Sequence, residues 1–550
     1  MNNSNKYRRY AQIAGVLLIS MLFLYSCDDE FLTGSPLDKV SDADVWEDIG
    51  LVETFVNEIY GDMRTGHSQH MSVSVTSDES YARERSGAHL VQAGGINPSD
   101  LGYMGWTWGH YYDIIASANI FTTNIQGESR DNLRAQDEEK LNRMIGEVKV
   151  LRAFAYHRLS SLYGGVPLIT TTFSLDDDMA VTRNSYDEVV DFIVSELDEA
   201  AALLPASHPD SEAGRVTEGA ALAIKSRALL YAASPLHNPS NDQSKWQEAA
   251  DAAKAVIDLN RYFLHPDYAE TFTEEGNFND EVIWELVINS DVWQRFNLER
   301  NLFPNGDGGW AVTVPTRRQV DTYETINGLQ PEDDPSYDPQ DPWVDRDPRF
   351  HATILYDEAP WRDREIEVFR PGGFDSPDSP SAPWNASWTG YYTKKFVDED
   401  FDRSLGESSS ANWIMARYGE ILLNYAEAQY FLGDEGTARD YVNMVRSRPS
   451  VNMPDVTDSG QDLFERIKNE RRVELYLEEH RLFDIRRWKL EYPADDWIER
   501  VNVDLDTDTG EKTISYSDLQ KWALPEHTYL IPIPEDEIQR NSLLEQNPGY

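Results

Sequence analysis

The segment 470–488 holds the densest group of side chains that could perform acid–base chemistry. Glu470, Glu474 and Asp484 would be its proton donors or acceptors if a substrate could reach them. Arginines, however, recur three residues from acids, in the pairs Arg471–Glu474, Glu478–Arg481, Arg481–Asp484 and Asp484–Arg487. Side chains at this spacing meet along one helical surface, and buried charge is costly unless it is paired. The spacing therefore predicts a structural ion-pair network and no catalytic residue.

Other patterns typical of catalysis or metal binding are weak. The sequence contains no Gly-x-Ser-x-Gly, His-Glu-x-x-His or Walker motif. Asp504, Asp506 and Asp508 are spaced as in a calcium loop, but Gly510 falls one place late and Ser515 stands where the bidentate Glu belongs. The acidic run 332–341 follows no ligand spacing. We therefore expect no enzyme activity, cofactor or metal site, and a structural calcium ion at an acidic turn is the alternative.

Aromatic side chains beside polar ones are the better candidates for function. The apolar face of a sugar ring packs on Trp or Tyr, while its hydroxyl groups bond to carboxylate, amide and guanidinium groups. Two segments carry this combination: the first offers Asp78, Tyr103 and Trp106, and the second offers Trp293, Arg295 and Trp310. Trp310 follows a flexible glycine-rich run. These six residues are the predicted ligand contacts.

Helices must position these segments, and apolar residues at steps of three and four predict them. The predicted helices cover 145–162, 185–205, 220–233, 246–259, 418–432 and 437–448. Ala426, Ala428 and Ala438 stand where helices must approach closely. Such pairs resemble tetratricopeptide packing, in which each pair buries its apolar face against its neighbours. Trp108 is at helical spacing from Tyr112 and is expected in the core.

Between the second and third helix pairs the character of the chain changes. Twelve of the 27 prolines fall within 304–383, and eight of the 15 tryptophans fall within 284–413. Proline excludes regular helix there, and disordered segments are poor in aromatic residues. We therefore expect a mainly α-helical protein that carries an ordered, loop-rich lobe over 284–413, where a binding site is to be sought.

The composition excludes several classes of protein. The 550 residues include 97 Asp and Glu against 49 Lys and Arg, a net charge of −48, which would repel nucleic acid. A single cysteine excludes an intramolecular disulfide framework and a cysteine-based metal site. The 15 Trp, 28 Tyr and 20 Phe are enough for a hydrophobic core, which excludes global disorder.

The single cysteine ends a segment typical of secretion. Basic residues at positions 6–9 precede the uncharged run 11–25, as in a signal peptide. The sequence Leu-Tyr-Ser-Cys that ends at Cys27 resembles a bacterial lipobox, in which the chain is cut before a cysteine that is then acylated. Residues 1–26 are thus the predicted signal peptide, and Cys27 is the predicted lipid anchor. The acidic tract 28–30 is either a solvated tether or an export signal.

Motifs near the C-terminus resemble those of the SusD/RagB family. They are Glu470-Arg471-Arg472-Val473-Glu474-Leu475 with its continuation to Trp488, and the ending from Tyr529 through Pro532-Ile533-Pro534 to Asn547-Pro548-Gly549-Tyr550. Shorter matches at 118–119, 147–153, 164–168, 214–217 and 425–428 extend the resemblance over nearly all of 27–550.

This resemblance implies a SusD-like fold with four tetratricopeptide-like helix pairs beside an irregular ligand-binding face. It divides the mature chain into an N-terminal region, 27–265, and a C-terminal region, 266–550. It also implies a surface-exposed outer-membrane lipoprotein that captures a nutrient, usually a glycan, for a SusC-like TonB-dependent transporter. The acidic tract would then be the export signal. The RagB side of the family allows a peptide ligand, and a surface carbohydrate-active hydrolase is the other alternative.

Overall fold

The computed structural model describes residues 42–67, 71–82, 87–174, 177, 180–288, 298–401 and 410–550. Three residues predicted to be functional, namely Cys27, Trp293 and Arg295, lie outside the described residues, as does the acidic tract 28–30. Within the described ranges, none of the helices combines the length and the apolar character that a membrane span requires.

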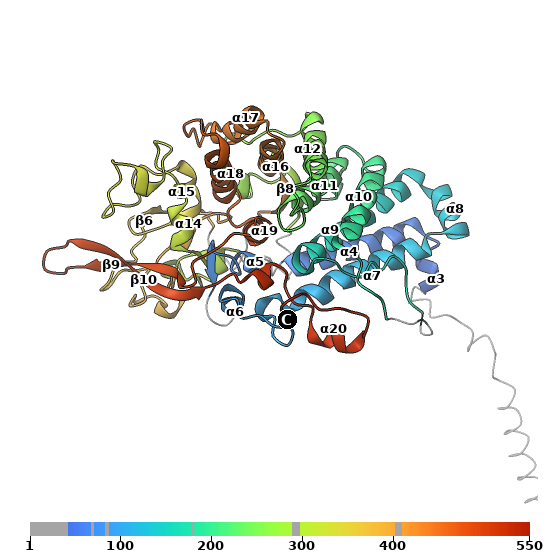
Figure 1. The fold of residues 1–550 in the computed structure, drawn as a ribbon, viewed down its shortest axis with the longest axis horizontal. Coiled ribbons are helices and arrows are strands. Elements are labelled where there is room, and N and C mark those ends of the chain that lie inside the picture. Colours follow the sequence, from blue (N-terminus) through green and yellow to red (C-terminus); the bar gives the residue numbers. More distant parts are fainter. Residues whose placement is uncertain are drawn as a thin grey trace, which may run out of the picture.

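Long helices form one side of the molecule. They are α4 (Ile49–His67), α7 (Thr107–Asn124), α9 (Glu138–Tyr163), α10 (Tyr186–Leu203), α11 (Glu218–Ala233), α12 (Gln243–Asp258), α16 (Tyr418–Phe431), α17 (Glu435–Arg446) and α18 (Gly460–Glu474). From α7 and α9 through α10, α11, α12 and α16 to α17, each helix packs against the next, and Figure 1 shows the series as an arc. This arrangement confirms the predicted tetratricopeptide-like scaffold.

Local sequence signals set the ends of these helices. Ser185 caps α10 in a capping box, in which its side chain accepts from the Glu188 amide and the Glu188 carboxylate accepts from the Ser185 amide. Gly164 ends α9 with a φ of 76°, which favours glycine. Ala426 and Ala438 are fully buried, as the predicted close approach of α16 and α17 requires. Trp108 is 5 % exposed in α7, which confirms its place in the core.

Between β2 (Val282–Leu286) and β8 (Trp413–Arg417), which pair antiparallel, the chain leaves the scaffold and returns. Its described elements there are short: α13 (Leu298–Leu302), β3 (Thr313–Pro315), α14 (Arg317–Asp321), α15 (Pro348–Thr353), β4 (Ile354–Leu355), β5 (Pro360–Trp361), β6 (Arg364–Glu365) and β7 (Tyr392–Thr393). The expected irregular lobe is therefore present. Beside it in Figure 1 projects a long antiparallel hairpin of β9 (Asp496–Leu505) and β10 (Lys512–Trp522).

The remaining helices and one further strand are short. They are α3 (Asp42–Val45), α5 (Met71–Ser74), β1 (Ser80–Ala82), α6 (Ala88–Gln92), α8 (Gly127–Gln136), α19 (Arg481–Arg487) and α20 (Glu535–Arg540). Strand β1 pairs with β3 of the lobe, β4 pairs with β7, and β5 pairs with β6, all antiparallel. The chain end is anchored on α9: the Ile531 amide donates to the Leu162 carbonyl, and the Asn547 side chain donates to the carbonyl of Tyr163 at the end of that helix.

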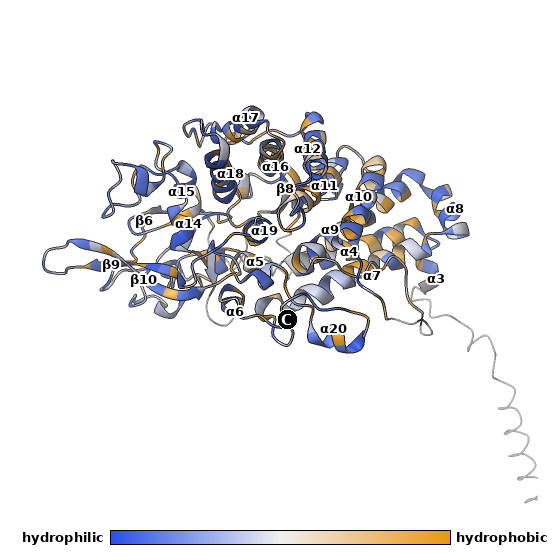
Figure 2. Cartoon of the chain, in the orientation of Figure 1, coloured by the Kyte–Doolittle hydropathy of each residue, from blue (hydrophilic) through white to orange (hydrophobic). Residues whose placement is uncertain are grey.

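A cluster of buried ion pairs joins the scaffold to the lobe. The Glu474 carboxylate at the end of α18 accepts from Arg417 at 2.7 Å, from Arg448 at 2.7 Å and from Arg349 of the lobe at 2.9 Å. Arg417 also bonds Glu281 and Glu478, and all six side chains are no more than about 9 % exposed. We call Glu281, Arg349, Arg417, Arg448, Glu474 and Glu478 the central ion cluster. Figure 2 accordingly colours much of α18 as hydrophilic, although it packs against α16 and α17.

The ion-pair network is confirmed, but three of its four predicted pairs are wrong. Asp484 pairs with Arg487 as predicted, at 2.8 Å. Arg471 pairs instead with Asp484, Glu478 with Arg417, and Arg481 with Asp78. The reason is a break in the helix: α18 ends at Glu474, α19 begins at Arg481, and Leu477 and Glu479 between them have φ values of 62° and 68°. Without one continuous helix, residues three apart do not share a surface.

Replacing Glu474 by Gln tests the central ion cluster. Removing one partner of a buried ion pair costs about 3–5 kcal/mol, because the remaining charge stays desolvated. We expect the unfolding free energy of Glu474→Gln, measured by urea denaturation, to fall by about that amount. The control is Glu526→Gln, since the Glu526 side chain is 79 % exposed in its pair with Lys489 and exposed pairs contribute less than about 1 kcal/mol. Equal losses in the two variants would contradict this role.

The buried carboxyl group of Glu79 predicts how the stability of the fold depends on pH. It is 1 % exposed, and burial raises the pKa of its carboxyl from 4.5 to about 8. Between these values the folded chain keeps a proton that the unfolded chain loses, so stability falls as pH rises. Glu79→Gln cannot titrate. The unfolding free energy of the variant minus that of the unaltered protein, both measured by urea denaturation, is expected to increase by about 1 kcal/mol or more between pH 5 and pH 8. Parallel pH profiles would refute the raised pKa.

Candidate ligand-binding surface

Trp310 lies at the surface of the lobe, as a stacking residue must. Its side chain is 41 % exposed, and the guanidinium of Arg300 from α13 lies 4.2 Å from the centroid of the indole. The Trp310 amide donates to the Arg300 carbonyl at 2.8 Å, which fixes the two residues together. An indole has two faces, and Arg300 covers one of them by a cation–π contact. The exposed part of the ring is open to a ligand.

The glycine-rich run before Trp310 is tightly packed, which corrects the expectation of a flexible segment. A Cβ atom on Gly309 would lie 1.9 Å from the Phe303 carbonyl oxygen, and one on Gly306 would lie 2.3 Å from the Asp375 carboxylate. Gly308 has a φ of 74°, in the left-handed region that favours glycine. The glycines therefore allow the close approaches that set the position of Trp310.

Trp384, which is not among the predicted ligand contacts, is the most exposed tryptophan among the described residues, at 70 %. It lies in the single turn Pro383–Asn385, and its loop joins the Trp310 loop: the Asn305 side chain donates to the Ser381 carbonyl at 3.0 Å. We call Trp310 and Trp384 together the aromatic surface. Proline beside Trp384 was a signal for a loop, but Trp388 in the same stretch is half-buried and stacks on Tyr81. Exposure is set by tertiary packing that the local sequence does not show.

Ion pairs and hydrogen bonds of partly buried side chains connect the loops that carry the aromatic surface. Arg364 bonds Asp307 of the Trp310 loop at 2.5 Å and Asp375 at 2.6 Å. Burial raises the pKa of Asp375, whereas its bond to Arg364 acts in the opposite direction. The hydroxyl of Tyr392 in β7 donates to Asn305 at 2.5 Å. The two tryptophan loops therefore share a partly buried polar base.

The structure brings the first predicted segment next to the second. Ala82 of β1 pairs with Thr313 of β3, three residues after Trp310, and Tyr103 packs against the small cluster that contains Ala82. Tyr103 and Trp106 are both half-buried. The ring of Trp106 contacts the rings of His110 and Tyr111, with centroids 5.3 and 5.9 Å apart, so part of it serves the packing of α7.

Asp78 does not lie at this surface. It is fully buried, and its carboxylate accepts two bonds from Arg481, at 2.7 and 2.8 Å, and one from the Tyr492 hydroxyl at 2.9 Å. Nearby arginines hold the pKa of Asp78 well below its usual range, against the effect of burial. The carboxylate predicted to contact a ligand is thus part of the core, and we leave it out of the candidate site.

The acidic turns considered for calcium have internal partners in the structure. Asp506 is in the turn of the β9–β10 hairpin, where its carboxylate accepts from the amides of Asp508 and Thr509. Asp334 in the run 332–341 accepts from Thr325, Asn327 and Ser336. Among the residues that the structure describes, no three His, Cys, Asp or Glu side chains are grouped as metal ligands.

Comparisons with known proteins agree with this architecture. The family described as "SusD family" matches residues 280–550, and the family described as "Starch-binding associating with outer membrane" matches residues 35–230. SusD-like protein P2 of Formosa agariphila is 25 % identical over 572 residues, covering 97 % of this chain and 98 % of its own. SusD-like protein P25 of the same organism is 25 % identical over 475 residues, covering 81 % of this chain and 79 % of its own.

Solved structures are similar over almost the whole chain. A SusD-like protein from Bacteroides fragilis superimposes with a TM-score of 0.77 at 28 % identity, covering 94 % of this chain and 100 % of its own. A SusD-like carbohydrate-binding protein from the same organism gives a TM-score of 0.75 at 26 % identity, with 91 % and 100 % covered. A helix-pair scaffold with an irregular aromatic lobe thus defines a protein of the SusD-like class. The chain belongs to the SusD family.

Proposed function

We propose that this protein is a cell-surface lipoprotein that binds an oligosaccharide or polysaccharide and passes it to a SusC-like TonB-dependent transporter of the outer membrane. The observation that carries the proposal is the exposure of Trp310 and Trp384 on two loops that hydrogen-bond to each other. Large aromatic side chains are costly to expose, and a sugar ring offers the apolar face that would cover them.

The comparisons support a glycan as the ligand. One similar structure is described as a SusD-like carbohydrate-binding protein, and another, at 22 % identity and a TM-score of 0.66, as a laminarin-binding SusD-like protein. One of the two matching families is described as associating with the outer membrane, which supports the proposed location. Trp106, Tyr103, Trp293 and Arg295 stay predicted contacts, and α13 begins three residues after Arg295.

We propose binding without cleavage. The carboxylates that could have served as acid and base, Glu470, Glu474 and Asp484, are each about 2 % exposed or less. All three are paired with arginine, at 2.5–2.9 Å. A carboxylate in this state does not reach a substrate, so the motif that is richest in acids supports the fold.

Alanine variants test the aromatic surface. The unaltered mature protein is expected to be retarded in native gels that contain its glycan, and to release no reducing ends from that glycan in solution. Loss of one stacking aromatic is worth about 0.5–1.5 kcal/mol beyond its buried area, so Trp310→Ala and Trp384→Ala are each expected to weaken binding about tenfold. The matched control is Trp497→Ala, because Trp497 is 40 % exposed on the β9–β10 hairpin, outside the lobe. Unchanged retardation of both lobe variants would reject the surface, and release of reducing ends would favour a hydrolase.

Substitution of Cys27 tests the lipid anchor. Cys27→Ala removes the proposed acylation site, so the protein is expected to leave the membrane fraction of the producing cells. Acylation is measured independently by mass spectrometry of the N-terminal peptide. A variant in which alanines replace the acidic tract 28–30 is expected to stay acylated. Because it would no longer be exported to the cell surface, it should resist protease added to intact cells. A Cys27→Ala protein that stays in the outer membrane would contradict lipid anchoring.

A further inference from the structure

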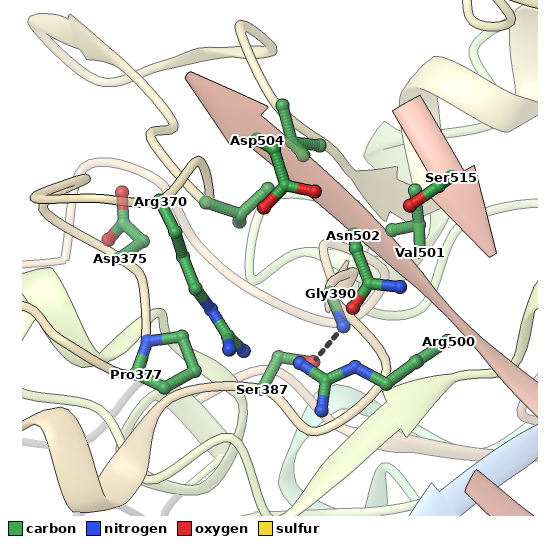
Figure 3. A pocket seen from close by; sticks show the side chains of 12 residues that line it. Arg370, Asp375, Pro377, Ser387, Gly390, Arg500, Val501, Asn502, Asp504 and Ser515 are labelled. Atoms are coloured by element: carbon green, nitrogen blue, oxygen red, sulfur yellow. Dashed lines mark hydrogen bonds between the residues drawn. The ribbon is translucent and has the colours of Figure 1, made fainter. Parts of the chain in front are cut away.

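A polar pocket of about 180 Å³ lies between β9 and the loops that follow residue 368. Figure 3 shows Arg370 and Arg500 extending from different sides of this pocket toward Ser387. Asn502, Ser515 and the acids Asp375 and Asp504 complete its polar lining. The volume is below the roughly 300–1,000 Å³ of sites that enclose a whole small molecule, so the pocket fits one charged group.

Main-chain contacts with β9 fix the positions of both arginines. The Arg370 amide donates to the Val503 carbonyl at 2.8 Å, and the Leu505 amide donates to the Arg370 carbonyl at 2.6 Å. On the other side, the Val501 amide donates to Thr389 at 2.9 Å. Gly390 has a φ of 82°, and a Cβ atom there would lie 2.6 Å from the Val501 oxygen. The walls of the pocket are therefore closely packed backbone.

The two arginines differ from the buried arginines of the central ion cluster. Within the described residues, neither Arg370 nor Arg500 forms an ion pair, and the Nε atom of Arg500 is buried without a hydrogen-bond partner. Burial and the positive charge of Arg370 lower the pKa of Arg500. In a chain with 97 acidic residues, two half-buried guanidinium groups thus extend into one pocket, and neither has an ion-pair partner among the described residues.

The acids that the structure describes around the pocket form no ion pair with either arginine, because they are bonded elsewhere or exposed to solvent. The Asp375 carboxylate is bonded to Arg364, at 2.6 and 2.8 Å. Asp378 is exposed and accepts from Ser376 and from the Gly372 amide, and these bonds, with a smaller contribution from the charge of Arg370, lower its pKa. Asp504 is exposed and forms no ion pair among the described residues. Two like charges held together at partial burial are unfavourable until an anion joins them.

We propose that this pocket binds an anionic substituent, a carboxylate or a sulfate ester, of the glycan that the protein captures. The inference rests on the proposed glycan-binding function and narrows its ligand to acidic glycans. A guanidinium group donates two parallel N–H bonds to the oxygens of either anion, and Arg370 and Arg500 approach from different sides. The Ser387 hydroxyl, which accepts from the Thr389 and Gly390 amides at 3.2 Å, provides a further donor.

The pocket is close to the aromatic surface along the chain. Ser387 follows Trp384 by three residues, a span of at most about 11 Å between their Cα atoms. Arg364, which bonds Asp375 in the pocket wall, also bonds Asp307 of the Trp310 loop. A glycan stacked on Trp384 could therefore place a charged substituent between the two arginines.

The test compares glycans of different charge at constant ionic strength. Native gels would contain a neutral glucan, a polyuronate or a sulfated galactan, and the variants are Arg370→Gln, Arg500→Gln and the double variant. We expect the double variant to lose affinity for one acidic glycan by about tenfold or more, since each charge-assisted hydrogen bond contributes substantially. The control Arg540→Gln removes the same charge from a side chain that is 71 % exposed on α20, and is expected to have no effect. Loss on the polyuronate identifies a carboxylate, and loss on the galactan identifies a sulfate.

Measurements of thermal unfolding show whether Arg370 and Arg500 bind an anion or only stabilise the fold. They also test anion binding independently of the proposed glycan-binding function. Because Arg370 and Arg500 repel each other, the double variant is expected to keep or raise the Tm of the protein. Sodium sulfate, compared with sodium chloride at equal ionic strength, is expected to raise the Tm of the unaltered protein more than that of the double variant. This comparison needs no glycan. An equal rise in both proteins, a lowered Tm of the double variant, or an equal loss of affinity for neutral glucan would overturn the proposal.

Discussion

The fold depends on neutralising charge that it removes from water. Glu474 accepts from three arginines that come from the strand β8, from the segment that follows α17 and from the lobe, so a single carboxylate joins three separate parts of the chain. Each of these groups would cost several kcal/mol to bury alone, and their mutual pairing makes the arrangement stable only when all are present. Apolar side chains of the scaffold could pack against many alternative neighbours. Each charge of the central ion cluster, in contrast, is neutralised only by its own partners.

The lobe that carries the aromatic surface is joined to this cluster. Arg349 of the lobe is bound to Glu474, and the strand pair β2–β8 closes the lobe where it leaves the scaffold. Within the lobe the glycines before Trp310 permit close contacts, and Arg364 joins the loops of the aromatic surface. Against this background of paired charge, Arg370 and Arg500 form no ion pair among the described residues, and the Nε atom of Arg500 is buried without a hydrogen-bond partner.

The sequence predicted those features that depend on local periodicity. Helix α10 begins where the sequence predicts it because Ser185 and Glu188 satisfy each other's backbone amides, and α9 ends at Gly164 for an equally local reason. The pairs within 470–488 were mostly wrong because Leu477 and Glu479 adopt left-handed backbone conformations that their residue types do not indicate. Asp78 and Trp384 show the same limit at the site. Asp78, whose carboxylate was expected at the surface, is buried and bonded to Arg481. Trp384 is exposed, although the residues beside it in the sequence do not predict this.

The Asp78–Arg481 bond joins residues that are 403 positions apart, and it has a consequence for the order of folding. Asp78 has no other ion-pair partner as close as Arg481, and the central ion cluster needs Glu474 from the same late part of the chain. A nascent chain that lacks its final eighty or so residues would hold unpaired acids and arginines where its core must form. Such contacts of high sequence separation slow folding. The protein can therefore complete its core only after its C-terminal segment has been made, and a chain that ends before Glu474 lacks the partners that its buried arginines require.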